Sequence, residues 1–145
     1  MRISAKGEYA IKALLDLSAN FDKGLIPIHD IAERQGIPQR YLEQVLLMLK
    51  RGGFLISRRG ASGGYHLGRS PGEISVGDVV RAVEGSLSPF DSTRRGGRRG
   101  SGDDLHALWE EVSQAVSSVL DRVTFADLVK RAEERENAAK PMYHI

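Results

Sequence analysis

Apolar residues recur at three- and four-residue intervals through most of the chain, which is the period of amphipathic α-helices. In the first such segment, which follows a candidate N-cap at Ser4, they lie at Ala10, Ala13, Leu14, Leu17 and Phe21. The segment 28–35 is shorter and ends before Gly36, a residue suited to a left-handed C-cap. A third helix is predicted to begin at Pro38 and to stop at the glycine pair after residue 51. Its buried stripe comprises Leu42, Val45, Leu46 and Leu49.

After the third helix the pattern changes to alternation, which predicts a β-hairpin. Two strands, FLISRR and YHLG, flank the turn ASGG, and the alternating positions are Leu55, Ser57, Tyr65 and Leu67. Two arginines, Arg58 and Arg59, precede the turn. Gly60, Gly63 and Gly64 let the backbone turn tightly and approach another molecule closely.

The second half of the chain is predicted to be helical again. Ser75 and Asp78 form a capping box for a helix that ends at Gly85, and the glycine-, serine- and arginine-rich stretch 86–102 has no period. A helix of about five turns then starts from Asp103 as its N-cap, and the last helix runs from Thr124 and Asp127 to Glu136. Apolar residues of the long helix lie at Leu105, Leu108, Trp109, Val112, Val116, Val119, Leu120 and Val123.

The apolar stripe of this long helix is longer than a small domain can cover. Packing against a second copy related by two-fold symmetry would bury it. We therefore predict a dimerisation surface made by Leu108, Trp109, Val112, Val116, Val119 and Leu120. The alternative is a core helix of a monomer, which the small number of other apolar elements disfavours. The predicted division is a head at 1–85, a flexible loop at 86–102, dimerisation helices at 103–136 and a tail at 137–145.

The second and third helices have the spacing of a helix-turn-helix, whose second helix enters the DNA major groove. The polar face of that helix offers Gln39, Arg40, Glu43 and Gln44, side chains that match the hydrogen-bonding groups of base edges. The hairpin is then a wing, whose arginines bind phosphate or a narrow minor groove. A solvated helix face and solubilising charges on a hairpin are the alternatives. The predicted fold class is mainly α with a small β-hairpin, a winged helix-turn-helix head followed by a long dimerisation helix.

Charge and composition narrow the function. Residues 1–70 hold 11 Lys and Arg against 6 Asp and Glu, a formal charge of +5, whereas residues 71–145 hold 10 against 13, a charge of −3. The basic half is the half expected to bind a polyanion. The 145-residue chain contains no cysteine, which excludes disulfides, thiolate metal sites and cysteine nucleophiles. Nothing resembles a membrane span or a signal peptide, so we expect a cytoplasmic protein.

Five stretches in order, SAKGEYA, DIAERQGI, YLEQVL, RRGASGGYHL and ISVGDVVRAVEG, resemble the family of winged-helix repressors that includes the iron-sulfur regulator IscR, the nitric-oxide sensor NsrR and the cysteine-metabolism repressor CymR. The resemblance implies a homodimer that represses transcription from double-stranded operators with two-fold symmetry. Carried over by position, Arg40, Tyr41 and Glu43 match the recognition helix of the family, Arg59 matches its wing arginine, and Lys6 matches a residue near the DNA backbone.

The chain departs from the cluster-binding members of that family in the loop at 86–102. Those sensors resemble one another in carrying three cysteines there, whereas this loop has Arg94, Arg95, Arg98 and Arg99 among glycines. His106 matches the position of an additional histidine ligand, but a lone histidine cannot hold an iron-sulfur cluster. We therefore expect no metal and no cofactor. The arginines either add non-specific DNA affinity or keep the loop solvated.

Among these relatives the chain most resembles CymR, which also lacks the cysteines, ends on isoleucine and is controlled by complex formation with cysteine synthase. The resemblance implies regulation of cysteine or sulfur metabolism. It also implies a partner-binding tail, Tyr143, His144 and Ile145, that docks into cysteine synthase. The alternative is a frayed tail without a partner.

Two other classes of function compete with DNA binding. An enzyme is not expected, because the four histidines, His29, His66, His106 and His144, are scattered and no Ser/His/Asp or HExxH pattern occurs. A winged helix that binds protein is disfavoured by the +5 charge of residues 1–70. A DNA-binding regulator whose effector is nitrite, a thiol or another sulfur metabolite remains a third possibility.

Overall fold

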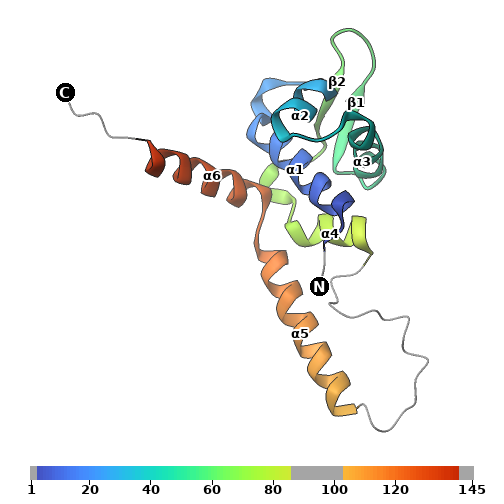
Figure 1. The fold of residues 1–145 in the computed structure, drawn as a ribbon, viewed down its shortest axis with the longest axis vertical. Helices are drawn as coiled ribbons and strands as arrows, with labels where there is room; N and C mark the ends of the chain where they lie inside the picture. The colour runs from blue at the N-terminus through green and yellow to red at the C-terminus, as the bar shows by residue number, and fades with distance from the viewer. Residues whose placement is uncertain (1–2, 86–102, 141–145) are drawn as a thin grey trace, which may run out of the picture.

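The computed structural model describes residues 3–85 and 103–140. Within these ranges the chain forms six α-helices, two 3-10 helices and one antiparallel hairpin (Figure 1). The helical and hairpin composition predicted from the sequence is therefore confirmed. The elements are α1 (Ala5–Ala19), η1 (Phe21–Lys23), α2 (Ile28–Gln35), α3 (Gln39–Arg51), β1 (Leu55–Arg58), β2 (Gly64–Leu67), η2 (Pro71–Glu73), α4 (Val76–Glu84), α5 (Asp103–Arg122) and α6 (Phe125–Ala139).

Helix α1 is the centre of the molecule, because α2, α3, α4 and α6 all pack against it (Figure 1). Its N-terminus is capped by Ser4, whose hydroxyl accepts a hydrogen bond from the Gly7 N–H at 3.1 Å, as predicted. Its inward positions, Ala10, Ala13 and Leu14, are fully buried. The core around them comprises Leu17, Ile31, Leu42, Leu46, Leu49, Ile74, Val79 and Phe125.

The α2–α3 turn follows the predicted chemistry with one difference. Gly36 has a φ of 64°, which is the left-handed conformation that ends α2. Pro38, expected to begin α3, lies one residue before it with extended backbone geometry, and its carbonyl accepts from the N–H groups of Tyr41 and Leu42. The proline therefore occupies the N-cap position, where its missing N–H leaves no helical hydrogen bond unmade.

The hairpin is attached to the helices through a residue that the sequence did not single out. Leu55 pairs with Leu67 and Arg58 with Gly64. Ile26, just before α2, exchanges two backbone hydrogen bonds of 2.8 Å with Tyr65 of β2. This bridge adds the Ile26 backbone as a third segment beside β1 and β2, and it fixes the position of the hairpin relative to α2.

A corner between α5 and α6 joins the C-terminal helices to the rest of the fold. The capping box of Ser75 is confirmed, and Thr124 forms a second capping box with Asp127. The Asp127 carboxylate accepts a hydrogen bond from the Thr124 N–H, and this bond lowers the pKa of Asp127. Between these caps, Ser75 and Thr124 form a β-bridge. Phe125 then enters the core and is fully buried.

The two C-terminal helices differ from the expected bounds only at their ends. Helix α6 continues to Ala139, beyond the predicted end at Glu136. Helix α5 begins at Asp103, and Figure 1 shows it extending from the corner away from the wing. The predicted loop at 86–102 and the tail residues 141–145 lie outside the described residues. Of the helices that are described, none has the length and apolarity that a membrane span requires.

One buried ion pair ties α1 to α2. The Asp16 side chain is only 2% exposed, and both its oxygens accept from the Arg34 guanidinium, at 2.8 and 2.9 Å. This hydrogen bonding raises the pKa of Arg34. Two parallel bonds from a planar guanidinium fix direction as well as distance, so the pair orients the first helix of the helix-turn-helix on α1.

The substitution Arg34→Ala is expected to lower the free energy of unfolding by about 1 to 3 kcal/mol, because it leaves the Asp16 carboxylate buried without a cation. The matched control is Lys12→Ala, which breaks the exposed Glu8–Lys12 pair of 3.4 Å and should cost about 0.5 kcal/mol or less. Urea denaturation of both variants measures the difference. Equal effects would contradict a structural role for the buried pair.

Candidate nucleic-acid interface

The exposed face of α3 carries all the predicted base-reading residues. The apolar stripe turns inward, so the opposite face points to solvent. The residues on or beside that face, all exposed, are Gln39, Arg40, Tyr41, Glu43 and Gln44. Tyr41 is 55% exposed although it is aromatic, which leaves its ring and hydroxyl available to a partner. The structure therefore brings these five side chains together at the start of one helix.

The wing lies beside α3 and encloses a cleft with it. Arg58 and Arg59 are exposed at the end of β1 and in the turn. Together with the start of α2 and the second half of α3 they line a cleft of about 530 Å³. Its lining includes His29, Leu47, Lys50, Arg58 and Arg59. The predicted helix face and the predicted wing arginines are thus parts of one surface.

The cations of this surface are not used by the fold. Within residues 3–85 and 103–140, none of Arg40, Lys50, Arg58 and Arg59 forms an ion pair, whereas Arg34 and Arg81 each bind a carboxylate. Lys6, at the start of α1, is likewise exposed and has no ion pair among the described residues. Unpaired guanidinium and ammonium groups can exchange their counterions for DNA phosphates, so this is the arrangement that polyanion binding requires.

Three residues of this surface were not identified from the sequence. Leu47 is 48% exposed and continues the outward face of α3 one turn beyond Glu43 and Gln44, so the helical period alone could have identified it. An apolar side chain there can contact a thymine methyl group. Lys50 and His29 line the cleft only because the wing lies beside α2 and α3, which no local pattern indicates.

Two glycines predicted to approach DNA have a structural reason to be glycine. A Cβ at Gly64 would come within 2.5 Å of the Ile26 backbone, and one at Gly63 would overlap the carbonyl oxygen of Arg58. Both positions therefore permit the hairpin to close and to pack on the segment before α2. Their contact with DNA stays a prediction.

The predicted dimerisation residues lie along α5 with different degrees of exposure. Leu108 and Val119 are 46% and 50% exposed, and Leu105 at the start of the stripe is 50% exposed. Trp109, Val112 and Val116 are half-buried. Leu120 packs against the core of its own chain, so it also anchors the helix. An exposed apolar row of this kind on a helix is unfavourable in water unless it is covered.

The donor groups of the chain do not fit an iron-sulfur cluster. Cluster iron is held mainly by cysteine thiolates, and the sequence has none. No group of three His, Asp or Glu side chains able to hold a metal occurs in the described residues. His106 is exposed and lies 3.8 Å from Glu110 on its own helix.

Comparison with known proteins decides the family. The family model Rrf2, described as an iron-dependent transcriptional regulator, matches residues 3–131. The chain belongs to the Rrf2 family. IscR of Cronobacter sakazakii, an HTH-type transcriptional regulator, is 41% identical over 134 residues, which cover 92% of this chain and 83% of that protein.

Solved structures place this Rrf2 protein among winged-helix regulators. The structure of CymR, the global cysteine regulator of B. subtilis, matches with a TM-score of 0.80 and 33% identity, covering 90% of this chain and 98% of that chain. IscR of T. potens matches with a TM-score of 0.78 and 35% identity, covering 99% and 94%. The Rrf2 protein is therefore a helix-turn-helix transcriptional regulator that binds DNA, and not an enzyme.

The substitution Gly64→Ala is expected to destabilise the protein by about 1 to 3 kcal/mol, because the added methyl group collides with backbone rather than with a movable side chain. The control is Gly72→Ala, whose Cβ would meet only Ala126 at 4.0 Å and should change stability by about 0.5 kcal/mol or less. Denaturation curves of the two variants give the comparison. A Gly64→Ala protein as stable as the control would show that the wing does not need this close approach.

Proposed function

We propose that this Rrf2 protein is a homodimeric repressor that binds operators of two-fold symmetry, carries no iron-sulfur cluster, and controls genes of cysteine or sulfur metabolism. The observation that carries the DNA-reading part is the surface of α3 and the wing, where polar base-reading side chains lie beside cations that have no partner in the described residues. Such a surface combines sequence reading with phosphate attraction.

The proposed roles follow from position on this surface. Gln44 and Glu43 face outward near the start of α3, where major-groove helices contact base edges. Arg40 lies one turn earlier and reads guanine or holds a phosphate. Arg58 and Arg59 extend from the wing to the backbone or the adjacent minor groove, and Lys6 binds the backbone from the start of α1.

The homodimer is proposed from the exposed row on α5. Leu105, Leu108 and Val119 are about half exposed on a helix that extends away from the head. A second α5 packed on them would remove this apolar area from water. A two-fold axis through that contact would present two copies of α3, and hence two half-sites.

The cluster-free part of the proposal rests on the donor set. The family model is described as iron-dependent, and IscR relatives are similar to this chain, yet its 145 residues include no thiolate ligand. A signal other than a cysteine-bound cluster must then control DNA binding. The similarity to CymR, the global cysteine regulator of B. subtilis, supports sulfur metabolism as the source of that signal.

Removing one side chain from each part of the surface separates base reading from phosphate binding. Gln44→Ala should lower the preference for operator over random DNA by about 1 to 3 kcal/mol. Arg59→Ala, if it binds phosphate, should weaken both complexes and should reduce the slope of log affinity against log salt by about 0.9 per lost contact. If Arg59 reads a narrow minor groove instead, A·T-rich flanks should lose the most affinity.

The control for these titrations is Arg135→Ala, which removes the same charge from the exposed end of α6. It should leave affinity and slope unchanged at fixed salt. Equal losses on operator and random DNA for Gln44→Ala would contradict a base-reading role.

The proposal includes cysteine synthase as a partner of the tail, Tyr143, His144 and Ile145, which lies outside the described residues. Removing Ile145 should weaken binding to purified cysteine synthase about tenfold or more, because burying an isoleucine side chain is worth about 1.5 to 3 kcal/mol. Met142→Ala is the control from the same tail. Calorimetric titration measures both, and undiminished binding without Ile145 would remove cysteine synthase from the proposal.

A further inference from the structure

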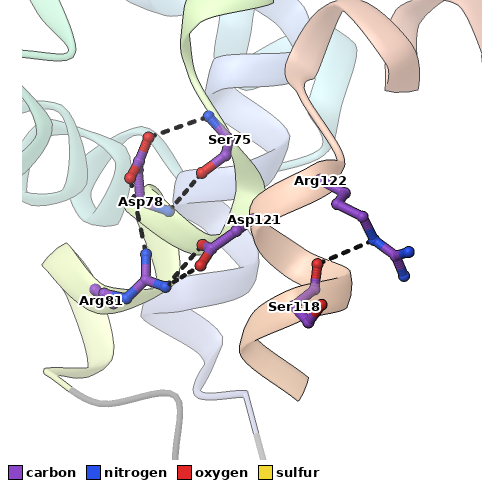
Figure 2. Close-up of polar contacts among 6 residues, drawn as sticks. All are labelled: Ser75, Asp78, Arg81, Ser118, Asp121 and Arg122. Atoms are coloured by element: carbon purple, nitrogen blue, oxygen red, sulfur yellow. Dashed lines mark hydrogen bonds and ion pairs between the residues drawn. The ribbon is translucent and has the colours of Figure 1, made fainter. Parts of the chain in front are cut away.

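An ion pair joins the head to α5 beside the corner between α5 and α6, where Ser75 pairs with Thr124. The guanidinium of Arg81, on α4, donates to both carboxylate oxygens of Asp121, on α5, at 2.7 and 2.5 Å (Figure 2). Asp78, one turn earlier on α4, lies 3.7 Å from the same guanidinium. The hydrogen bond to Asp121 raises the pKa of Arg81. The pair thus connects the last turn of the long helix directly to the helix that packs on α1.

The backbone at the corner supplies a second connection. The Val76 N–H donates to the Val123 carbonyl at 2.8 Å, and the Phe125 N–H donates to the Ile74 carbonyl at 3.0 Å. These two bonds hold a short stretch of chain and act as a pivot. They do not by themselves fix the tilt of α5, because α5 continues away from the pivot over its whole length (Figure 1).

Close approach of the two helices makes the ion pair specific to one geometry. At Gly77, in the first turn of α4, an added Cβ would overlap the Asp121 carboxylate oxygen. Any side chain at this position would displace the Asp121 carboxylate from its place beside Arg81. Gly77 therefore leaves the space in which the Arg81–Asp121 pair forms, and the pair restrains the angle between α4 and α5.

A small change in this angle is large at the far end of α5. The helix has 20 residues, and at about 1.5 Å per residue it is about 30 Å long. A tilt of about 7° at the corner moves the far end by about 3.7 Å, close to the ~3.4 Å rise of one base pair. Because the proposed dimer contact lies along α5, such a tilt changes the separation of the two DNA-reading helices.

We propose that the Arg81–Asp121 pair, seated against Gly77, determines the half-site spacing that the dimer accepts. The pair acts as a positioning element and contacts no base. The inference rests on the proposed two-fold dimer and assigns to this corner the task of selecting among operators that contain the same half-sites at different separations.

The test is selection on a library in which two identical half-sites, taken from the best wild-type operator, are separated by spacers of varied length. Wild type should prefer one spacing. In Arg81→Ala that preference over the neighbouring spacings should fall by about two- to fivefold, the range that a partly exposed ion pair supplies. Asp121→Asn should behave in the same way, and the reversed pair Arg81→Asp with Asp121→Arg should recover part of the preference.

The chain offers a matched control in Arg122→Ala. Arg122 is next to Asp121 but points away from Arg81, and among the described residues it donates only to the Ser118 carbonyl of its own helix, at 3.1 Å (Figure 2). This variant loses the same charge and should keep the wild-type spacing profile. Thermal unfolding of each variant accompanies the selection, because a merely stabilising contact would weaken binding at all spacings alike.

The outcomes separate the inference from the function on which it rests. A wild-type spacing optimum with an unchanged profile in Arg81→Ala and Asp121→Asn, or a uniform loss at all spacings, would overturn the inference and leave the dimeric repressor intact. If wild type bound single half-sites as well as paired ones, with no optimum, the two-fold dimer itself would be wrong. A broadened or shifted profile in both variants, absent from Arg122→Ala, supports the inference.

Discussion

Burial of α1 is the constraint on which the rest of the structure depends. Ala10 and Ala13 have no exposed surface, and their small side chains let neighbouring helices approach the α1 backbone closely. Because the apolar stripe of α3 packs on this helix, the opposite, polar side of α3 faces solvent. Asp16, buried on the same helix, then orients α2 through Arg34. The DNA-reading surface is thus a consequence of how one helix is covered.

The basic side chains serve two different roles, one in holding the fold together and one in binding DNA. Arg34 and Arg81 are bound by carboxylates and hold helices together, whereas the cations of α3 and the wing have no such partner among the described residues. A basic side chain already paired inside the fold loses an internal bond when it binds phosphate, but an unpaired one does not. This difference, and not the small net charge of +2, explains why one face of the molecule suits a polyanion.

The features predicted well from the sequence are those determined by neighbouring residues, above all the helix ends. Caps at Ser4, Ser75 and Thr124 and the left-handed Gly36 gave helix ends within about a residue, because the hydrogen-bonding requirements of a helix end are met by side chains next to it. Pro38 was misplaced by one residue because proline suits both the N-cap and the first helical position. These errors do not alter the fold.

Contacts between segments distant in the chain were not predictable in this way. The bridge of Ile26 to Tyr65, the entry of Phe125 into the core and the reach of Lys50 and His29 into the cleft each depend on how separate elements meet. The exposed face of α3 was found because it is the complement of a periodic stripe. Leu47 belongs to that face, outside the predicted stripe, and was missed because only polar side chains were considered as base-reading residues.

The most direct test of the dimeric DNA-binding repressor is selection of genomic fragments from the source organism by the purified protein at fixed physiological salt. We predict enrichment of a two-fold-symmetric site beside genes of cysteine synthesis or sulfur uptake, in the absence of any added iron or sulfide. Enrichment of symmetric sites beside unrelated genes would contradict the assignment to sulfur metabolism. Selection of single, unsymmetric sites, or of none, would contradict the dimeric DNA-reading surface itself.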